Sequence, residues 1–259
     1  MPLEVPDMTI VAHTAADRPD LWARSIDDAD VWPEYNRHGD VANRWWSSLA
    51  TELPEFQFVL YDTATDRVVA EGHTGPFFWD GTDPTLPDSF DATLELVFEQ
   101  HRSGRPANTL TALAAEVPRH ATQRGLAIEL LQGMRTIATR HQLDHLVAPV
   151  RPMLKHRYPL VSIEEYVTWR RADGGAFDPW IRVHERLGAR TATPLPQSFK
   201  ITGTVDEWEA WTDMAFPISG DFVFPEGLAT VHIDHANNRG TYWEPNVWLI
   251  HPDLTSKHG

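Results

Sequence analysis

EVPRHATQRGLAIELLQGMR, residues 116–135, is the stretch that decides the fold of this 259-residue chain. It continues an apolar run at 109–118, TLTALAAEVP, which predicts a buried strand that ends at Pro118. A polar loop then leads through Gly125 into a helix expected over 124–141. Its apolar side chains recur at helical spacing and form one core-facing stripe: Ala127, Leu130, Leu131, Met134, Ile137 and Ala138. Strand, loop and amphipathic helix in this order predict an α/β layer around one sheet.

The start of this helix has two interpretations. The first backbone N–H groups of a helix have no partner inside it, so they can bind a phosphate, and Gly125 lets a ligand approach closely. A tight turn that feeds a core helix explains the same glycine without any ligand. This stretch alone leaves both interpretations open.

The composition limits the class of protein. Hydrophobic residues make up 42% of the chain, enough for the core of one elaborated domain or two small ones. No apolar run is long enough to span a bilayer, and the N-terminus lacks the order of a signal peptide. The absence of cysteine excludes disulfides and thiolate metal sites. We therefore expect a cytoplasmic protein without a membrane partner.

The charge is strongly negative but uneven. With 37 acids and 22 bases the formal net charge is −15, which makes general binding to nucleic acid unfavourable. The window 117–157 nevertheless holds two acids, Glu129 and Asp144, against seven bases. The bases are Arg119, Arg124, Arg135, Arg140, Arg151, Lys155 and Arg157. A basic island in an acidic chain is a candidate anion site.

The remaining elements follow from hydrophobic periodicity and turn residues. Strands are expected at 8–13, 56–61, 67–73, 143–150 and 229–234, and helices at 18–27, 41–53, 90–101 and 177–190, with a strand and then a helix within 196–214. The segment 157–176 has no clear pattern and is expected to be an insertion. A tail that contains proline and glycine runs to the C-terminus.

The strand that ends in Val-Pro, the loop, the helix, the next strand and a late helix that ends in Arg-Leu-Gly together resemble the GCN5-related N-acetyltransferase (GNAT) superfamily. In that family the loop pattern is Gln/Arg-x-x-Gly-x-Gly/Ala, and its amides hold the pyrophosphate of coenzyme A. The matching positions here are Thr122, Gly125 and Ala127. The resemblance is clearest over 109–190.

The resemblance implies an α/β fold with a mixed, splayed central sheet and helices on both faces. The insertion at 157–176 and a C-terminal segment would elaborate this fold, with the sheet splayed near residue 117. We expect an acyltransferase domain at 1–227. An extension at 228–259 would pack on the same domain or on a partner, and the oligomeric state stays open.

The resemblance also implies where the acyl donor lies. The amide of Val117 would face the thioester carbonyl, and the donor would contact Arg119, Thr122, Gln123, Arg124, Gly125, Leu126 and Ala127. Thr122 departs from the Arg or Gln of the family, so Arg124 or Arg119 would supply the charge. An acyl carrier protein, whose phosphopantetheine has one phosphate and no adenosine, is an alternative donor to acyl-coenzyme A. Either would be a co-substrate rather than a permanently bound cofactor.

Two residues are candidates for proton transfer. His184 stands where relatives often have a tyrosine that protonates the leaving thiolate, and histidine titrates near neutrality. A histidine on a helix flank with only a structural hydrogen bond is the competing interpretation. Glu116 is a candidate base for the amine, although strand alternation places it on the face opposite Val117.

Substrate or carrier contacts are expected at Arg151, Lys155, Arg157 and Tyr158, just after a predicted strand, where open α/β sheets bind ligands. A solvated loop explains the same bases. Trp79, in a loop rich in glycine and aspartate, is a candidate cover for the substrate. No metal is expected, because the His232 to His235 motif is typical of a surface turn.

These patterns predict an enzyme that moves an acyl group from a phosphopantetheine thioester to the amine of a small molecule by direct attack. Two alternatives come from other classes of function. One is a GNAT-like binding module without turnover. The other is a transferase that uses aminoacyl-tRNA as donor, which the net charge of −15 disfavours.

Overall fold

One mixed sheet dominates the computed structural model, which describes residues 10–24, 26, 31–118 and 125–254. Nine strands within these residues lie in the order β1-β2-β3-β4-β5-β9-β8-β7, with β6 paired to β9. They are β1 (Ile10–Thr14), β2 (Gln57–Asp62), β3 (Arg67–Phe77), β4 (Thr109–Glu116), β5 (His145–Val150), β6 (Arg190–Gly203), β7 (Gly220–Phe222), β8 (Val231–Asp234) and β9 (Arg239–Ile250). The pair β4–β5 is parallel and the other pairs are antiparallel, which confirms the predicted mixed sheet.

The helices are α1 (Pro19–Trp22), α2 (Ala42–Glu52), α3 (Phe90–Ser103), α4 (Leu126–Arg140), α5 (Ile163–Tyr166), α6 (Pro179–Arg186) and α7 (Val205–Thr212), with 3₁₀ turns at η2 (Glu34–His38), η3 (Pro54–Phe56), η4 (Asp83–Thr85) and η6 (Lys155–Arg157). Local chemistry fixes their ends. The Ser89 side chain accepts the Ala92 N–H at the start of α3, and Gly104 ends that helix at a φ of 70°. None of the described helices is long and apolar enough to cross a bilayer.

Helices α3 and α4 cover opposite faces of the sheet. Gly72 and Gly75 of β3 lie three residues apart, so they face opposite sides. The fully buried Phe58 ring lies over Gly72 and reaches Gly133 of α4, whereas Val97 of α3 lies over Gly75. The predicted arrangement of helices on both faces is confirmed.

Strands β4 and β5 separate soon after they begin to pair. Their parallel register covers Thr109 to Thr111 against His145 to Val147 and then ends. The register between β3 and β4 also shifts between His73 and Thr74, which leaves Leu113 as an extra residue in β4. The sheet is therefore splayed, and the splay begins well before Val117.

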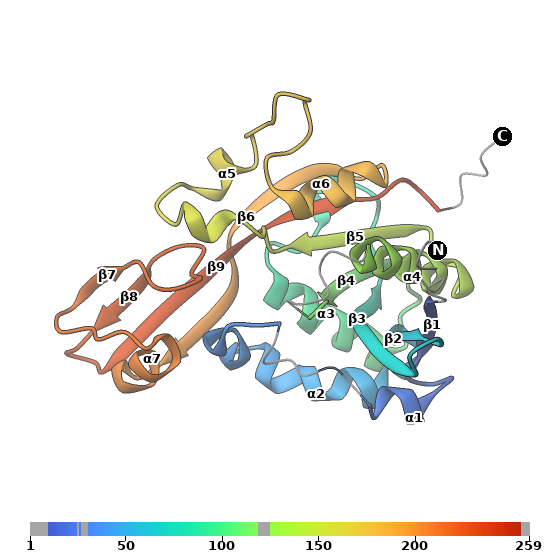
Figure 1. Ribbon diagram of the computed structural model, residues 1–259, viewed down its shortest axis with the longest axis horizontal. Coiled ribbons are helices and arrows are strands. Elements are labelled where there is room, and N and C mark those ends of the chain that lie inside the picture. The colour runs from blue at the N-terminus through green and yellow to red at the C-terminus, as the bar shows by residue number, and fades with distance from the viewer. Residues whose placement is uncertain (1–9, 25, 27–30, 119–124, 255–259) are drawn as a thin grey trace, which may run out of the picture.

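The C-terminal segment contributes interior strands. Sequence patterns predict β8 but miss β7 and β9, and β9 lies between β5 and β8 in the sheet order. Figure 1 shows β6 and β9 as a long pair that reaches one end of the molecule, where β7, β8 and α7 lie. The segment 228–254 therefore packs on its own chain. The predicted boundary between residues 227 and 228 does not divide the sheet, because strands on both sides of it belong to the same sheet.

Candidate active site

A cavity of about 980 Å³ lies where β4 and β5 have separated. Residues 112–117 line it from β4 and the residues that follow, and residues 148–151 line it from the end of β5. Ala127, Leu131 and Met134 of α4 close one side. The splay of the parallel strands thus leaves a space that reaches the start of α4.

Three buried titratable residues cluster at one end of this cavity. Glu71 lies opposite Glu116 in the β3–β4 register, and His73 is two residues further along β3 on the same face. The His73 Nε2 atom lies 3.8 Å from Glu71 Oε2 and 3.9 Å from Glu116 Oε1. Their nearest nitrogen and oxygen atoms all lie within 4.8 Å of one another, so the three side chains are also suitable ligands for a metal ion.

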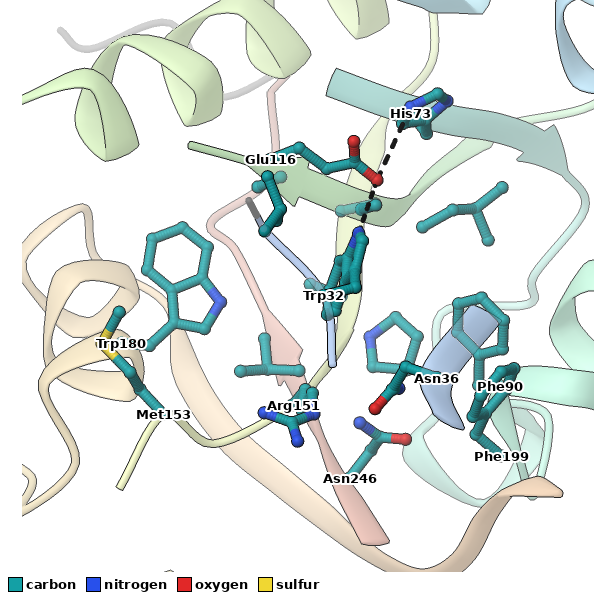
Figure 2. A pocket seen from close by; sticks show the side chains of 18 of the residues that line it. Trp32, Asn36, His73, Phe90, Glu116, Arg151, Met153, Trp180, Phe199 and Asn246 are labelled. Carbon is teal, nitrogen blue, oxygen red and sulfur yellow. Dashed lines mark hydrogen bonds and ion pairs between the residues drawn. The ribbon is translucent and has the colours of Figure 1, made fainter. Parts of the chain in front are cut away.

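Hydrogen bonds hold both carboxylates of this cluster. Trp32 Nε1 donates to Glu116 Oε1 at 2.8 Å, as Figure 2 shows, and the Ile26 amide donates to Glu71 Oε1 at 2.6 Å. Burial lowers the pKa of His73 to about 4, although the two carboxylates act in the opposite direction. At neutral pH the His73 imidazole is therefore uncharged and a weak base.

A second polar group lies at the other end of the cavity lining in Figure 2. Arg151 forms an ion pair with Glu244 of β9, with 3.0 Å between Nε and Oε1, and its Nη2 donates to Tyr35 Oη at 3.1 Å. Burial opposes the charge of Arg151, but the Glu244 carboxylate raises its pKa above the ordinary value. Asn36 Nδ2 donates to the same Glu244 oxygen at 3.3 Å.

His184 of α6 lines the cavity and is 1% exposed. Its Nδ1 lies 3.0 Å from Nε2 of His251, just after β9, while its Nε2 is buried without a partner among the described residues. Burial and the neighbouring His251 lower the pKa of His184 well below its ordinary value. His184 is therefore uncharged at neutral pH, and one of its nitrogens remains available to a ligand.

Comparison with known proteins identifies the family. No family model matches the chain. The arginine N-acetyltransferase avaD of Aspergillus versicolor is 32% identical over 272 residues, which cover 93% of each chain. The chain belongs to the GCN5-related N-acetyltransferase superfamily. It is an N-acyltransferase, and it transfers an acyl group to an amine.

Solved structures agree on the fold of this N-acyltransferase. The loading GNATL domain of CurA from Lyngbya majuscula superposes with a TM-score of 0.59 at 17% identity, over 96% of this chain and 99% of that one. The GNAT-like decarboxylase GphF, in complex with isobutyryl-CoA, gives a TM-score of 0.52 at 18% identity, over 95% and 98%. At these identities the likeness concerns the fold alone.

The structure places only part of the predicted donor site of the N-acyltransferase. Arg119, Thr122, Gln123 and Arg124 lie outside the described residues. Val117 and Ala127 line the cavity, and Leu126 is buried in the core. Gly125 precedes α4 in the left-handed region, at a φ of 73°, and none of the described side chains caps that helix. Within the described residues, the N–H groups of the first turn are thus left without a side-chain cap.

Lys155 and Arg151, two of the bases predicted to contact the substrate or a carrier, are not exposed. Lys155 is 1% exposed, its Nζ donates to the Tyr158 and Leu228 carbonyls, and burial lowers its pKa to about 8. Arg151 does line the cavity, but as the partner of Glu244, while Arg140 pairs with Asp17. These three bases of the window 117–157 therefore do not form one basic surface in the folded protein.

Two aromatic residues and one base that were predicted to contact the substrate are not part of the cavity lining. Tyr158 packs against Tyr166, Trp169 and Phe177 within the insertion, and Arg157 is exposed in the adjacent turn. Trp79 is 3% exposed, and its Nε1 donates to the Thr82 carbonyl. None of these three residues is among those that line the cavity, so their contact with the substrate stays a prediction.

Sequence analysis missed several residues of the lining. The sequence could have identified Glu71 and His73 as site candidates, because two titratable side chains at alternate positions of a predicted strand share one face. No sequence pattern identified Glu244 and Asn246, since β9 contains Pro245 and was expected to be part of the tail. Glu116 was expected on the wrong face, yet its carboxylate lies in the cavity lining.

Proposed function

We propose that this chain transfers an acyl group from acyl-coenzyme A to the amine of a small basic molecule, and that arginine is the acceptor to test first. The cavity between β4 and β5 carries this proposal, because it joins the start of α4 to a buried cluster of two carboxylates and a histidine. The curated relative avaD, named for arginine, supports the choice of acceptor.

The donor would lie along the gap between the strands. The first turn of α4, which follows Gly125 and has no cap from the described side chains, suits the pyrophosphate of the coenzyme, because helix N-terminal N–H groups and the helix dipole both favour an anion. The pantetheine arm would follow residues 112–117, so that the thioester reaches the Val117 region by resemblance to the family. GphF, a protein with the same fold, was solved with isobutyryl-CoA.

The amine would be activated at the acidic cluster. Transfer requires a neutral amine, whose lone pair attacks the thioester carbonyl while the C–S bond breaks and sulfur leaves as the thiol. We assign the proton of the amine to Glu116, which lines the cavity with the uncharged His73 beside it. His184 remains the candidate hydrogen-bond donor to the leaving sulfur, through the Nε2 atom that has no partner among the described residues. The proton that the thiol gains comes from the amine by way of Glu116.

A free coenzyme fits the charge distribution better than a carrier protein does. A carrier needs an exposed basic surface near the donor channel, but Lys155 is buried and Arg151 is paired with Glu244. Of the three described bases predicted to contact a carrier, Arg151, Lys155 and Arg157, only Arg157 is exposed. A carrier-protein donor is therefore an outcome of the test.

The first experiment combines calorimetric titration with coenzyme A and a thiol-release assay with acetyl-coenzyme A and arginine. We expect micromolar binding that is at least about tenfold weaker in Gly125→Glu, because the new carboxylate repels the pyrophosphate. Gly104→Glu is the matched control, since Gly104 has a similar φ of 70° and an equally open Cβ position at the far end of another helix.

Each outcome decides between donors. Binding that Gly125→Glu weakens and Gly104→Glu leaves unchanged would support the coenzyme site. If coenzyme A does not bind and no thiol is released, the proposal fails and a carrier protein becomes the donor to test.

A further inference from the structure

Glu244 and Asn246 share one face of β9 because they lie two residues apart. They lie where the β6–β9 pairing is irregular: Leu195 is opposite Asn246 and Phe199 is opposite Glu244, with extra residues of β6 between them. The pairing of β5 with β9 ends at Val150 and Val247, next to Asn246. Both side chains therefore line the cavity where the strands around it are interrupted.

Two carboxamide oxygens of this lining have no hydrogen-bond partner among the described residues. Asn246 is 4% exposed, and its Oδ1 is fully buried. Asn36 Oδ1 is in the same state, and its orientation is fixed because its Nδ2 donates to the Glu244 carboxylate. A buried carbonyl oxygen without a donor is costly, so two of them in one cavity indicate a ligand that supplies N–H groups.

The guanidinium of Arg151 does not satisfy these oxygens. Its Nε faces Glu244, and its Nη2 donates to Tyr35 Oη and, at 3.2 Å, to the Glu226 carbonyl. Arg151 thus neutralises Glu244 and fixes its position. The two asparagine oxygens remain as acceptors in this part of the lining.

The lining as a whole carries an excess of negative charge, although Arg151 balances Glu244 at this end. The described residues around the cavity include four carboxylates, Glu71, Glu116, Glu226 and Glu244, and two guanidiniums, Arg37 and Arg151, which together give −2. In Figure 2 the Phe90 and Phe199 rings lie beside Asn36, away from Glu116. Apolar walls beside acceptor oxygens suit a flat group whose edge donates hydrogen bonds and whose faces are apolar.

We infer that Asn36, Asn246 and Glu244 form a subsite for a guanidinium group of the acceptor, at the end of the cavity away from Glu116. A guanidinium has five N–H donors in one plane, enough for both carboxamide oxygens. The acceptor class is then an amine that also carries a guanidinium, with the reacting nitrogen near Glu116. This inference rests on the proposed acyl transfer and specifies its substrate class.

The test compares arginine with norleucine, which has the same α-amine and a side chain without donors. Acetyl-coenzyme A is the donor, and kcat/KM is measured for the wild-type protein and for Asn246→Leu, Asn246→Asp and Thr191→Val. Thr191→Val is the matched control, because the Thr191 hydroxyl is also buried without a partner among the described residues and belongs to the same strand pair, but lies outside the cavity lining.

We expect the wild-type protein to prefer arginine by at least about 100-fold, since a site built for N–H donors rejects an analogue that lacks them. Asn246→Leu should lower kcat/KM for arginine by about 10- to 100-fold and leave norleucine unchanged. Asn246→Asp keeps acceptor oxygens and should preserve the preference, as should Thr191→Val.

The outcomes distinguish failure of the guanidinium subsite from failure of the proposed acyl transfer. Thiol release with equal use of arginine and norleucine by the wild-type protein would overturn the guanidinium subsite and leave acyl transfer intact. A preference for arginine that persists in Asn246→Leu would also overturn it. If coenzyme A does not bind and no amine is acylated, the proposed function fails and the subsite falls with it.

Discussion

His184 Nδ1 and His251 Nε2 lie 3.0 Å apart and form a hydrogen bond between two buried imidazoles. Burial lowers the pKa of both rings, that of His251 to about 4, so both are uncharged at neutral pH. Only one of the two facing nitrogens then carries the proton. The direction of this bond therefore decides whether His184 Nε2 presents a proton or a lone pair to the cavity.

Replacement of His251 tests this relationship. His251→Phe removes the hydrogen bond at similar ring volume, and we expect kcat to fall about tenfold because the tautomer of His184 is no longer fixed. Coenzyme A affinity, measured by calorimetry, should not change. His251→Gln restores a hydrogen-bonding group and should recover part of kcat. A drop in affinity with unchanged kcat would show that His251 has only a structural role.

Glu116→Gln should lower kcat about 100-fold, since the amide cannot take the proton of the amine while it can still accept from Trp32. The loss should shrink at high pH, where more of the acceptor amine is already neutral. Glu71→Gln, directly opposite in the strand register, is the comparison. Equal losses in the two variants at every pH would argue against Glu116 as the base.

Asp91→Asn should stabilise the protein at alkaline pH. Asp91 Oδ2 accepts the Lys200 N–H, its Oδ1 is buried without a partner among the described residues, and burial raises the pKa of Asp91 to about 7. Between pH 3.8 and 7 the folded state therefore holds more protons than the unfolded state, and stability falls as pH rises.

Urea unfolding at pH 4 and pH 8 measures this effect. Asp91→Asn should raise the free energy of unfolding by about 3 kcal/mol more at pH 8 than at pH 4. Exposed Asp88, just before α3, provides the control Asp88→Asn, which should show no such difference. An equal effect of Asp91→Asn at both pH values would mean that Asp91 is ionised in the folded state at both.

Gly133→Ala should destabilise the protein although alanine favours helices. A Cβ at Gly133 would lie 2.6 Å from Phe58 Cε2, and Gly72 confines the other part of the ring. We expect a loss of about 1 to 3 kcal/mol in thermal or urea unfolding. In a Phe58→Leu background the same change should be neutral or favourable. Additive effects of the two changes would show that the ring does not limit this position.

The sequence predicted the parts of the fold that depend on local pattern. Helix α4 and strand β4 follow from apolar spacing and from Pro118, and the resemblance in residues 109–190 predicted the splayed sheet. Strand β9 was missed because Pro245 and Asn246 interrupt its pattern. In the structure Pro245 and Asn246 lie where β6 pairs irregularly with β9. That pairing joins residues far apart in the sequence, so the pattern of neighbouring residues does not predict it.

The sequence by itself determined the family resemblance, the acidic charge, the order of elements around Gly125 and the choice of Glu116 and His184 as candidates for proton transfer, because these depend on residue type and near-neighbour spacing. Tertiary structure alone decided what surrounds them. It paired Arg151 with Glu244, buried Lys155, joined His184 to His251 and brought Glu71 and His73 to Glu116. These contacts join residues from different strands and helices, so strand register and burial fix them.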